Sequence, residues 1–393
     1  MRSDSAPSAT VPIGGSVLLR PDGLDELIVT LRQAGFAVKG PVVRDGAIVV
    51  GEVSSRADLP VGVRDEQSPG HYEIRHESDE RLFGWAVGPG SWKAEFFTPA
   101  HEEWRAVPEN GSFRFVEPDL EPVTVAVFGA RPCELVALGT LDRVLRDGAY
   151  PDAGYAGRRD GAFIVVAECV TPAATCFCTS MSSGPGATQD FDLSLVELDD
   201  ERGHRFLVRV GSARGADVIT RVHWEPATED DALARRRSLD RAASSMGRHL
   251  ETDGLAALLA RNIEHPRWDD VAERCLSCGN CTLVCPTCFC SDVRDATDLD
   301  GSVTRRRTWA SCFDLDHSYL HGGAVRASAP SRYRQWLTHK LSTWWDQFDT
   351  LGCVGCGRCL TWCPVGIDIT EEAAAIRARD GATRVDLHRK GAV

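Results

Sequence analysis

One short cysteine pattern occurs twice in the chain, first as Cys275-Leu-Ser-Cys278-Gly-Asn-Cys281-Thr-Leu-Val-Cys285-Pro286. The second copy reads Cys353-Val-Gly-Cys356-Gly-Arg-Cys359-Leu-Thr-Trp-Cys363-Pro364. Each copy is a C-x2-C-x2-C-x3-C-P run, which is the spacing of cysteine ligands to [4Fe–4S] clusters. Three thiolates at such short steps can wrap one face of a cubane because the loop is tight, and a glycine relieves the backbone in both loops. The pattern therefore predicts two cubane sites.

The same spacing occurs in bacterial ferredoxins with two clusters, where the fourth cysteine of each run binds the neighbouring cluster. Carried over to this chain, the pattern predicts one cluster bound by Cys275, Cys278, Cys281 and Cys363. It predicts a second cluster bound by Cys353, Cys356, Cys359 and Cys285. We expect the fourth cysteine of each run to begin a helix. Two cubanes that share ligand loops indicate short-range electron transfer, and the pattern contains no catalytic residue.

Zinc is the alternative metal, because paired C-x2-C units also form sites with four thiolates. In each run a third cysteine follows at the same short step and a Cys-Pro closes the run, which favours iron–sulfur clusters. A structural zinc-binding scaffold is therefore the alternative from another class of protein. Colourless, iron-free protein with full zinc occupancy would favour it.

A long insert, residues 286–352, separates the two runs, whereas compact ferredoxins have far fewer residues there. It contains three histidines (His317, His321 and His339) and the basic, aromatic runs Arg305-Arg306-Arg307-Thr308-Trp309 and Arg332-Tyr333-Arg334-Gln335-Trp336. These runs are typical of a docking face for a partner subunit or of a lid over the clusters, and equally of a solvated surface. The insert also carries Cys288, Cys290 and Cys312, for which structural burial or a partial site is the expectation.

A second group of thiols lies in the N-terminal half. The apolar runs 123–128 and 163–167 predict two parallel strands, with a crossover helix that begins near Pro132. Because the carboxyl ends of parallel strands open onto one edge of a sheet, thiols that follow both strands can meet there. We expect a third metal centre, most simply [4Fe–4S], with zinc or unligated thiols as alternatives, at Cys133, Cys169, Cys176 and Cys178.

Composition limits the classes of function. The 15 cysteines are odd in number, so they cannot all pair in internal disulfides, and in a reducing compartment they indicate metal ligation. A net charge of −13 argues against nucleic-acid and anionic-membrane partners. The start of the chain lacks the apolar stretch of a secretory signal and no long apolar run follows, so we expect a cytoplasmic protein.

The predicted fold class is α+β, with five parts. Residues 1–10 are expected to be disordered, and residues 11–225 to form a mixed α/β domain with a βαβ unit and the possible third centre. Residues 226–270 are expected to form a helical connector. Residues 271–380 are expected to form a ferredoxin-like domain with two [4Fe–4S] clusters and the long insert. Residues 381–393 form the tail.

Several stretches together resemble one family, the β subunits of the soluble sulfhydrogenases, which are NADP-linked [NiFe] hydrogenases, and the related A subunits of anaerobic sulfite reductases. The similarity covers about residues 70–370 and is carried by residues 88–93, 129–135, 175–181, 275–290, 309–312 and 353–368. The resemblance implies an electron-transfer subunit without turnover of its own. Its partners would be a flavin subunit that reacts with NAD(P)H and the [NiFe] subunits, or a sirohaem subunit in the sulfite reductase alternative. The chain has no G-x-G-x-x-G fingerprint after a strand and is not expected to bind the nicotinamide itself.

Overall fold

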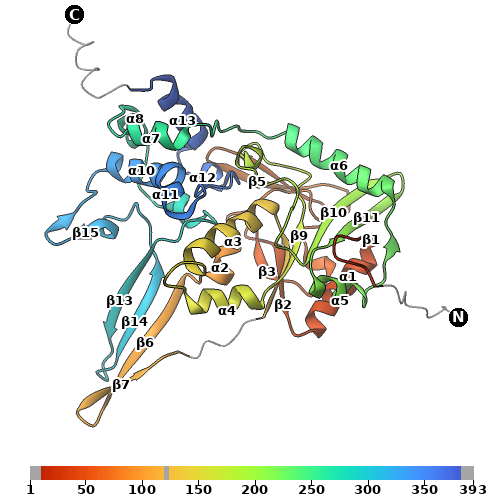
Figure 1. The fold of residues 1–393 in the computed structure, drawn as a ribbon, viewed down its shortest axis with the longest axis horizontal. Helices are drawn as coiled ribbons and strands as arrows, with labels where there is room; N and C mark the ends of the chain where they lie inside the picture. Colours follow the sequence, from red (N-terminus) through yellow and green to blue (C-terminus); the bar gives the residue numbers. More distant parts are fainter. Residues whose placement is uncertain (1–9, 119–123, 382–393) are drawn as a thin grey trace, which may run out of the picture.

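The computed structural model describes residues 10–118 and 124–381. The predicted disordered N-terminus and C-terminal tail lie, apart from residues 10 and 381, outside the described residues. Figure 1 shows an eight-stranded sheet beside a helical region that contains both cysteine runs. The strand order of the large sheet is β12 (Glu225–Pro226), β1 (Ser16–Leu19), β11 (Gly203–Val210), β10 (Leu193–Asp200), β9 (Phe163–Ala167), β8 (Val125–Ala130), β2 (Ala37–Arg44) and β3 (Ala47–Glu52).

The centre of this sheet is parallel and buried on both faces. Strands β2, β8, β9 and β10 pair in parallel, whereas the outer pairs are antiparallel. Helices α1 (Pro21–Gln33) and α5 (Ala213–Ile219) cover one face, and α3 (Pro132–Leu145) and α4 (Ala153–Gly161) cover the other. Strands β8 and β9 are continuously apolar because each side chain contacts one helical layer or the other. The predicted parallel pair and its crossover helix are therefore present.

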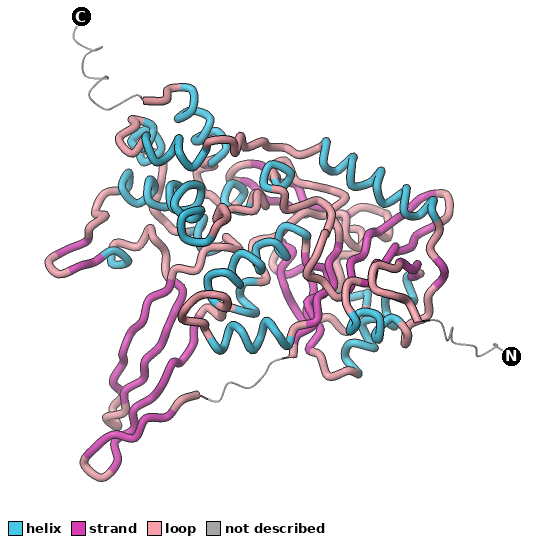
Figure 2. Tube along the Cα trace, viewed as in Figure 1, coloured by secondary structure: helices cyan, strands magenta, loops and turns pink. Residues whose placement is uncertain are grey.

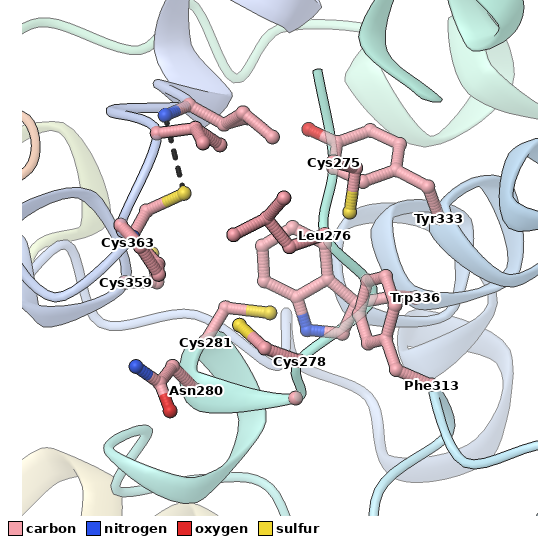
Figure 3. Close-up of a pocket in the computed structure, with 14 residues that line it drawn as sticks. Cys275, Leu276, Cys278, Asn280, Cys281, Phe313, Tyr333, Trp336, Cys359 and Cys363 are labelled. Carbon is pink, nitrogen blue, oxygen red and sulfur yellow. Dashed lines mark hydrogen bonds between the residues drawn. The ribbon is translucent and has the colours of Figure 1, made fainter. Parts of the chain in front are cut away.

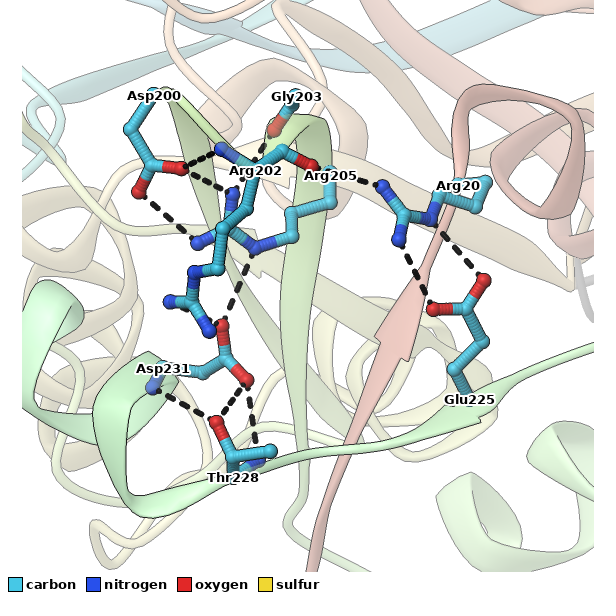
Figure 4. A network of polar contacts seen from close by, with 8 residues as sticks. All are labelled: Arg20, Asp200, Arg202, Gly203, Arg205, Glu225, Thr228 and Asp231. Carbon is cyan, nitrogen blue, oxygen red and sulfur yellow. Dashed lines mark hydrogen bonds and ion pairs between the residues drawn. The ribbon is translucent and has the colours of Figure 1, made fainter.

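Helix α6 (Glu229–Ser244), in the predicted connector, is tied to the sheet by a buried carboxylate (Figure 4). Asp231 forms ion pairs with Arg205 of β11 at 3.2 Å and with Arg202 at 2.7 Å. It also accepts a 2.6 Å hydrogen bond from the hydroxyl of Thr228, the residue that caps the helix. Burial alone would raise the pKa of Asp231, but the hydrogen bonds from Thr228 and Arg205 lower it, so the ion pair is kept at neutral pH.

A second sheet joins the N-terminal half to the insert. Its order is β13 (Ser291–Thr297), β14 (Val303–Trp309), β6 (Ala100–Glu109) and β7 (Ser112–Val116), and Figure 2 shows it as an arm that extends away from the body. Strand β14 of the insert pairs antiparallel with β6, so that Arg307 lies opposite His101. This sheet spans two of the predicted domains, and the proposed domain division stays a prediction.

The cysteine runs lie in the helical region. Its core contains Trp268, Tyr333, Trp336, Leu360 and Ile376. The helices are α7 (Leu255–Arg261), α8 (Arg267–Ala272), α9 (Asn280–Leu283), α10 (Ala329–Thr338), a π-helical turn (His339–Thr343), α11 (Trp344–Phe348), α12 (Arg358–Thr361) and α13 (Ile369–Ala378). The shorter elements are helix α2 (Lys93–Phe96), the hairpins β4–β5 (Val63–Ser68, His71–His76) and β15–β16 (Tyr319–Leu320, Gly323–Ala324), and three 3-10 turns (Arg56–Asp58, Cys178–Met181 and Asp316–Ser318). Among the described residues, no helix combines the length and apolar character needed to cross a membrane.

One local expectation was wrong. The fourth cysteine of each run was expected to begin a helix, but the short helices α9 and α12 end just before Cys285 and Cys363. Each short helix starts after a glycine with positive φ, Gly279 at 76° and Gly357 at 77°. The turn therefore comes between the second and fourth cysteines, and a Cys-Pro ends it because proline cannot supply the amide hydrogen that would continue the helix.

Candidate metal centres

Four thiols of the first predicted set gather in one pocket (Figure 3). Cys275, Cys278, Cys281 and Cys363 line it together with Phe313, Tyr333 and Trp336. Burial, followed by the charges of Cys275, Cys363 and Cys278, raises the pKa of Cys281 well above its ordinary value. Metal binding would offset this penalty, because a metal stabilises the thiolate form.

The surroundings of this pocket fit a sulfur-rich anion. The backbone amide of Ile367 donates to Cys363 Sγ at 3.3 Å, and that of Ser277 donates to Cys275 Sγ at 3.4 Å. Within the described residues, the buried Tyr333 hydroxyl and Trp336 Nε1 have no hydrogen-bond partner. Buried donors normally have partners, so these two are available to sulfur atoms in the pocket.

The second predicted set is also brought together. Burial, and then the charges of Cys353, Cys285 and Cys356, raise the pKa of Cys359. Cys285, from the first run, therefore lies among three cysteines of the second run, as the ferredoxin pattern predicts. The amide of Gly355 donates to Cys353 Sγ at 3.4 Å.

A buried ammonium distinguishes this second set. Lys340 Nζ lies 3.2 Å from Cys285 Sγ, and it also donates to the Gly352 carbonyl at 2.7 Å. Burial alone would lower the pKa of Lys340, but the charges of Cys285 and Cys288 outweigh it and raise the pKa. Lys340 was not predicted from sequence, because a lysine in a polar stretch gives no signal of burial.

We predict that Lys340 raises the reduction potential of a cluster at the second set, since a positive charge and a hydrogen bond to a ligand sulfur both favour the more negative, reduced state. Changing Lys340→Met should lower the potential of one cluster by about 59 mV, a tenfold change in a one-electron equilibrium. Lys340→Arg keeps the positive charge, so this variant should keep most of the wild-type reduction potential. Redox titration followed by paramagnetic resonance measures this, and an unchanged potential at full iron content would refute it.

The four N-terminal thiols also meet, at the edge of the large sheet. Cys133 lies in the first turn of α3 and Cys169 follows β9. Burial and then the charges of Cys169 and Cys356 raise the pKa of Cys178 to about 12. Burial and then the charges of Cys169 and Cys178 raise the pKa of Cys176. The four side chains are 6–8% exposed, so this group is closed to solvent.

This N-terminal group lies directly against the second cysteine run. The amide of Phe177 donates to the carbonyl of Gly355 at 2.8 Å. A Cβ atom on Gly355 would come within 2.5 Å of the Phe177 carbonyl oxygen, and one on Gly357 would come equally close to that of Thr175. Both glycines have positive φ, so the close approach and the backbone conformation require glycine at both positions.

Arg358 lies between the N-terminal thiol group and the second cysteine set, and it was not predicted from sequence. It is 2% exposed, donates to the Gly88 carbonyl at 2.8 Å, and forms a 2.5 Å ion pair with Glu134. Burial alone would lower its pKa, but the charges of Glu134, Cys356 and Cys133 raise it. A permanent positive charge therefore stands beside thiols of both groups, which suits anionic clusters on either side.

The described thiols are not grouped in the way that a single metal ion requires. Throughout residues 10–118 and 124–381, no group of three or more His, Cys, Asp or Glu side chains is arranged to hold one metal ion. In a cubane each thiolate binds a different iron, so the ligand sulfurs stand apart around the cluster. The metal at Cys133, Cys169, Cys176 and Cys178 stays a prediction.

Comparison with known proteins gives two matches. A family model described as a 4Fe-4S dicluster domain matches residues 274–367, which include both cysteine runs. The beta subunit of sulfhydrogenase 2 from Pyrococcus furiosus is 34% identical over 249 residues, which are 62% of this chain and 71% of that subunit. No solved structure matches the chain. With a dicluster iron–sulfur domain and this relative, the chain belongs to the family of sulfhydrogenase beta subunits.

Proposed function

We propose that this chain relays electrons through three cluster sites inside a larger redox complex. The first site is Cys275, Cys278, Cys281 and Cys363, and the second is Cys353, Cys356, Cys359 and Cys285. The third is Cys133, Cys169, Cys176 and Cys178. When bound, a [4Fe–4S] cluster would take up and release one electron at a time.

The observation that carries the proposal is the contiguity of the three thiol sets. Cys356 of the second set raises the pKa of Cys133 and Cys178 of the third set, so their sulfur atoms are neighbours. Cys285 of the second set likewise raises the pKa of Cys281 of the first. The second set is therefore in the middle, which is the order that a relay requires.

The two ends of this row differ in exposure. Cys278 of the first set is exposed and its neighbour Leu276 is 63% exposed, whereas all four cysteines of the third set are buried. A short electron transfer to another protein needs a cluster close to the surface. The first set is therefore the end that faces a partner, and apolar Leu276 suits a protein contact.

The partners that we propose are a flavin subunit that reacts with NAD(P)H and the [NiFe] subunits of a hydrogenase. The sulfhydrogenase relative supports this choice over a sirohaem subunit. The chain itself would hold the electron path, and its charged residues Lys340 and Arg358 would set the charge around it. The reaction with hydrogen would occur in the partner.

Purification of the native complex, with identification of its companions, tests this proposal. A flavoprotein and a nickel-containing subunit are the expected companions. A sirohaem subunit would instead assign the chain to a sulfite reductase. A zinc-loaded chain without companions would refute the relay.

A further inference from the structure

The hairpin β15–β16 of the insert carries several exposed apolar side chains. Its two strands pair antiparallel, with His321 and Gly322 between them. Within residues 315–325, four large apolar side chains are between 52% and 65% exposed, and we call them the hairpin patch: Leu315, Tyr319, Leu320 and Val325. Apolar side chains that gather on one surface element mark a contact with another molecule, whereas single ones need no explanation.

The hairpin patch does not hold the hairpin in place. The backbone of the hairpin closes on itself, because the amide of Val325 donates to the Ser318 carbonyl at 3.0 Å and the amide of Arg326 donates to the Ser318 hydroxyl at 3.1 Å. None of the four side chains belongs to the apolar core of the helical region. Figures 1 and 2 show the hairpin projecting from that region. The patch is therefore free for a contact with another molecule.

The hairpin stands at the rim of the first cysteine set. Phe313, just before the hairpin, and Tyr333, which follows it in α10, both line the pocket of the first set (Figure 3). Arg332 of α10 also donates to the hydroxyl of Ser277 at 3.5 Å, between two ligand cysteines. A protein bound to the hairpin would therefore lie close to Cys278, the exposed cysteine of that set.

Two partly exposed arginines near the hairpin patch have no carboxylate partner. Within the described part of the chain, neither Arg326 nor Arg332 forms an ion pair, and Nε of Arg332 is buried without a hydrogen-bond partner. The carboxylates of the hairpin base, Asp314 and Asp316, lie near Arg294 of β13 instead. Guanidinium groups bind carboxylates in a fixed geometry. Since the whole chain has a net charge of −13, these two free cations favour a partner that presents carboxylates here.

We propose that the hairpin patch, together with Leu276 and Arg326, is the docking surface for the redox subunit that exchanges electrons with the first set. This inference rests on the proposed function, because a cluster in the first pocket is what gives docking there a redox role. The matching surface of the partner is apolar at its centre and carries carboxylates at its edge. A second copy of this chain fits less well, because a two-fold contact would place Arg326 and Arg332 of both copies in one interface.

The first test locates the partner in the native complex, purified without oxygen. It uses the variant Leu320→p-benzoylphenylalanine, whose side chain forms a covalent link to its neighbours on irradiation. Mass spectrometry should find the link in a peptide that contains Asp or Glu and belongs to a companion subunit with a flavin or a metal. The control is the same change at Ile13, which is 62% exposed and precedes β1, at the other end of the molecule from β15 in Figure 1. Its link should not reach that peptide.

The second test measures how firmly that companion is held. In Leu320→Glu, the concentration at which the complex dissociates on dilution should rise at least about tenfold, because a new carboxylate would be buried against an apolar surface. Arg326→Glu should raise it too, and should make the dissociation less dependent on salt than in the wild type. Ile13→Glu makes the same chemical change elsewhere and should leave it unchanged. Mass photometry measures the dissociation, and the iron content of each variant should stay full.

Two outcomes would overturn the inference and leave the proposed relay intact. The first is that position 320 links only to this chain or to a second copy of it. The second is that the Leu320→Glu complex, with full iron content, dissociates at the wild-type concentration. Wild-type protein that has no iron or no companion subunit would overturn the proposed function as well.

Discussion

Replacing Cys356 with serine should abolish NAD(P)H-driven hydrogen chemistry in the assembled complex while hydrogenase activity with an artificial dye survives. Cys356 belongs to the middle set and contributes to the raised pKa of Cys133 and Cys178, so its loss interrupts the row between both ends. The loss should exceed the roughly 10–100-fold effect of removing a partner outside the ligand shell. In the proposed complex a dye would deliver electrons directly to the catalytic subunit and so bypass this chain. Parallel assays with NADPH and with the dye measure the difference.

Cys312→Ser is the matched control, because it makes the same chemical change next to the path but outside the three sets. It should leave NAD(P)H-driven activity in place. Loss of both activities in Cys356→Ser, with the complex intact, would mean that the electron path runs elsewhere.

Wild-type protein prepared without oxygen should contain about twelve irons per chain, at four per cubane. The double variant Cys176→Ser/Cys178→Ser should contain about eight, because it removes two of the four ligands at the third site while both ferredoxin-type sets remain. Iron and acid-labile sulfide analysis measures both values. A fall in visible absorption of about one third should accompany the loss of iron.

The alternatives at the third site give different metal contents. About eight irons and one zinc in the wild-type chain would indicate a four-thiolate zinc site at Cys133, Cys169, Cys176 and Cys178. About eight irons with no zinc would mean that these thiols are unligated, and would refute the third cluster.

The candidate ligands in the two cysteine runs could be predicted from sequence because they are identified by short-range spacing along the chain. The spacing within each cysteine run determines how closely three thiols can approach, and it needs no knowledge of the rest of the fold. The third group was predictable for a related reason: Cys133 and Cys169 follow two apolar runs, and parallel strands carry such positions to one edge. Each prediction used a short-range rule and one rule of sheet geometry.

The features that were missed all depend on contacts between distant segments. Lys340 reads as an ordinary surface lysine, and only the fold places its ammonium against Cys285, 55 residues earlier in the chain. Arg358 follows a ligand cysteine, but its partner Glu134 is 224 residues away. The pairing of β14 with β6 likewise joins the insert to the N-terminal half, and neither strand has a pattern that identifies its neighbour.

The most direct test of the account is spectroscopy of the full chain purified without oxygen. If the chain binds neighbouring iron–sulfur clusters, it should show a broad brown charge-transfer absorption that bleaches on reduction. The reduced protein should also give a paramagnetic signal that is broadened by interaction between the clusters. A colourless chain with no reducible paramagnetic centre would contradict it.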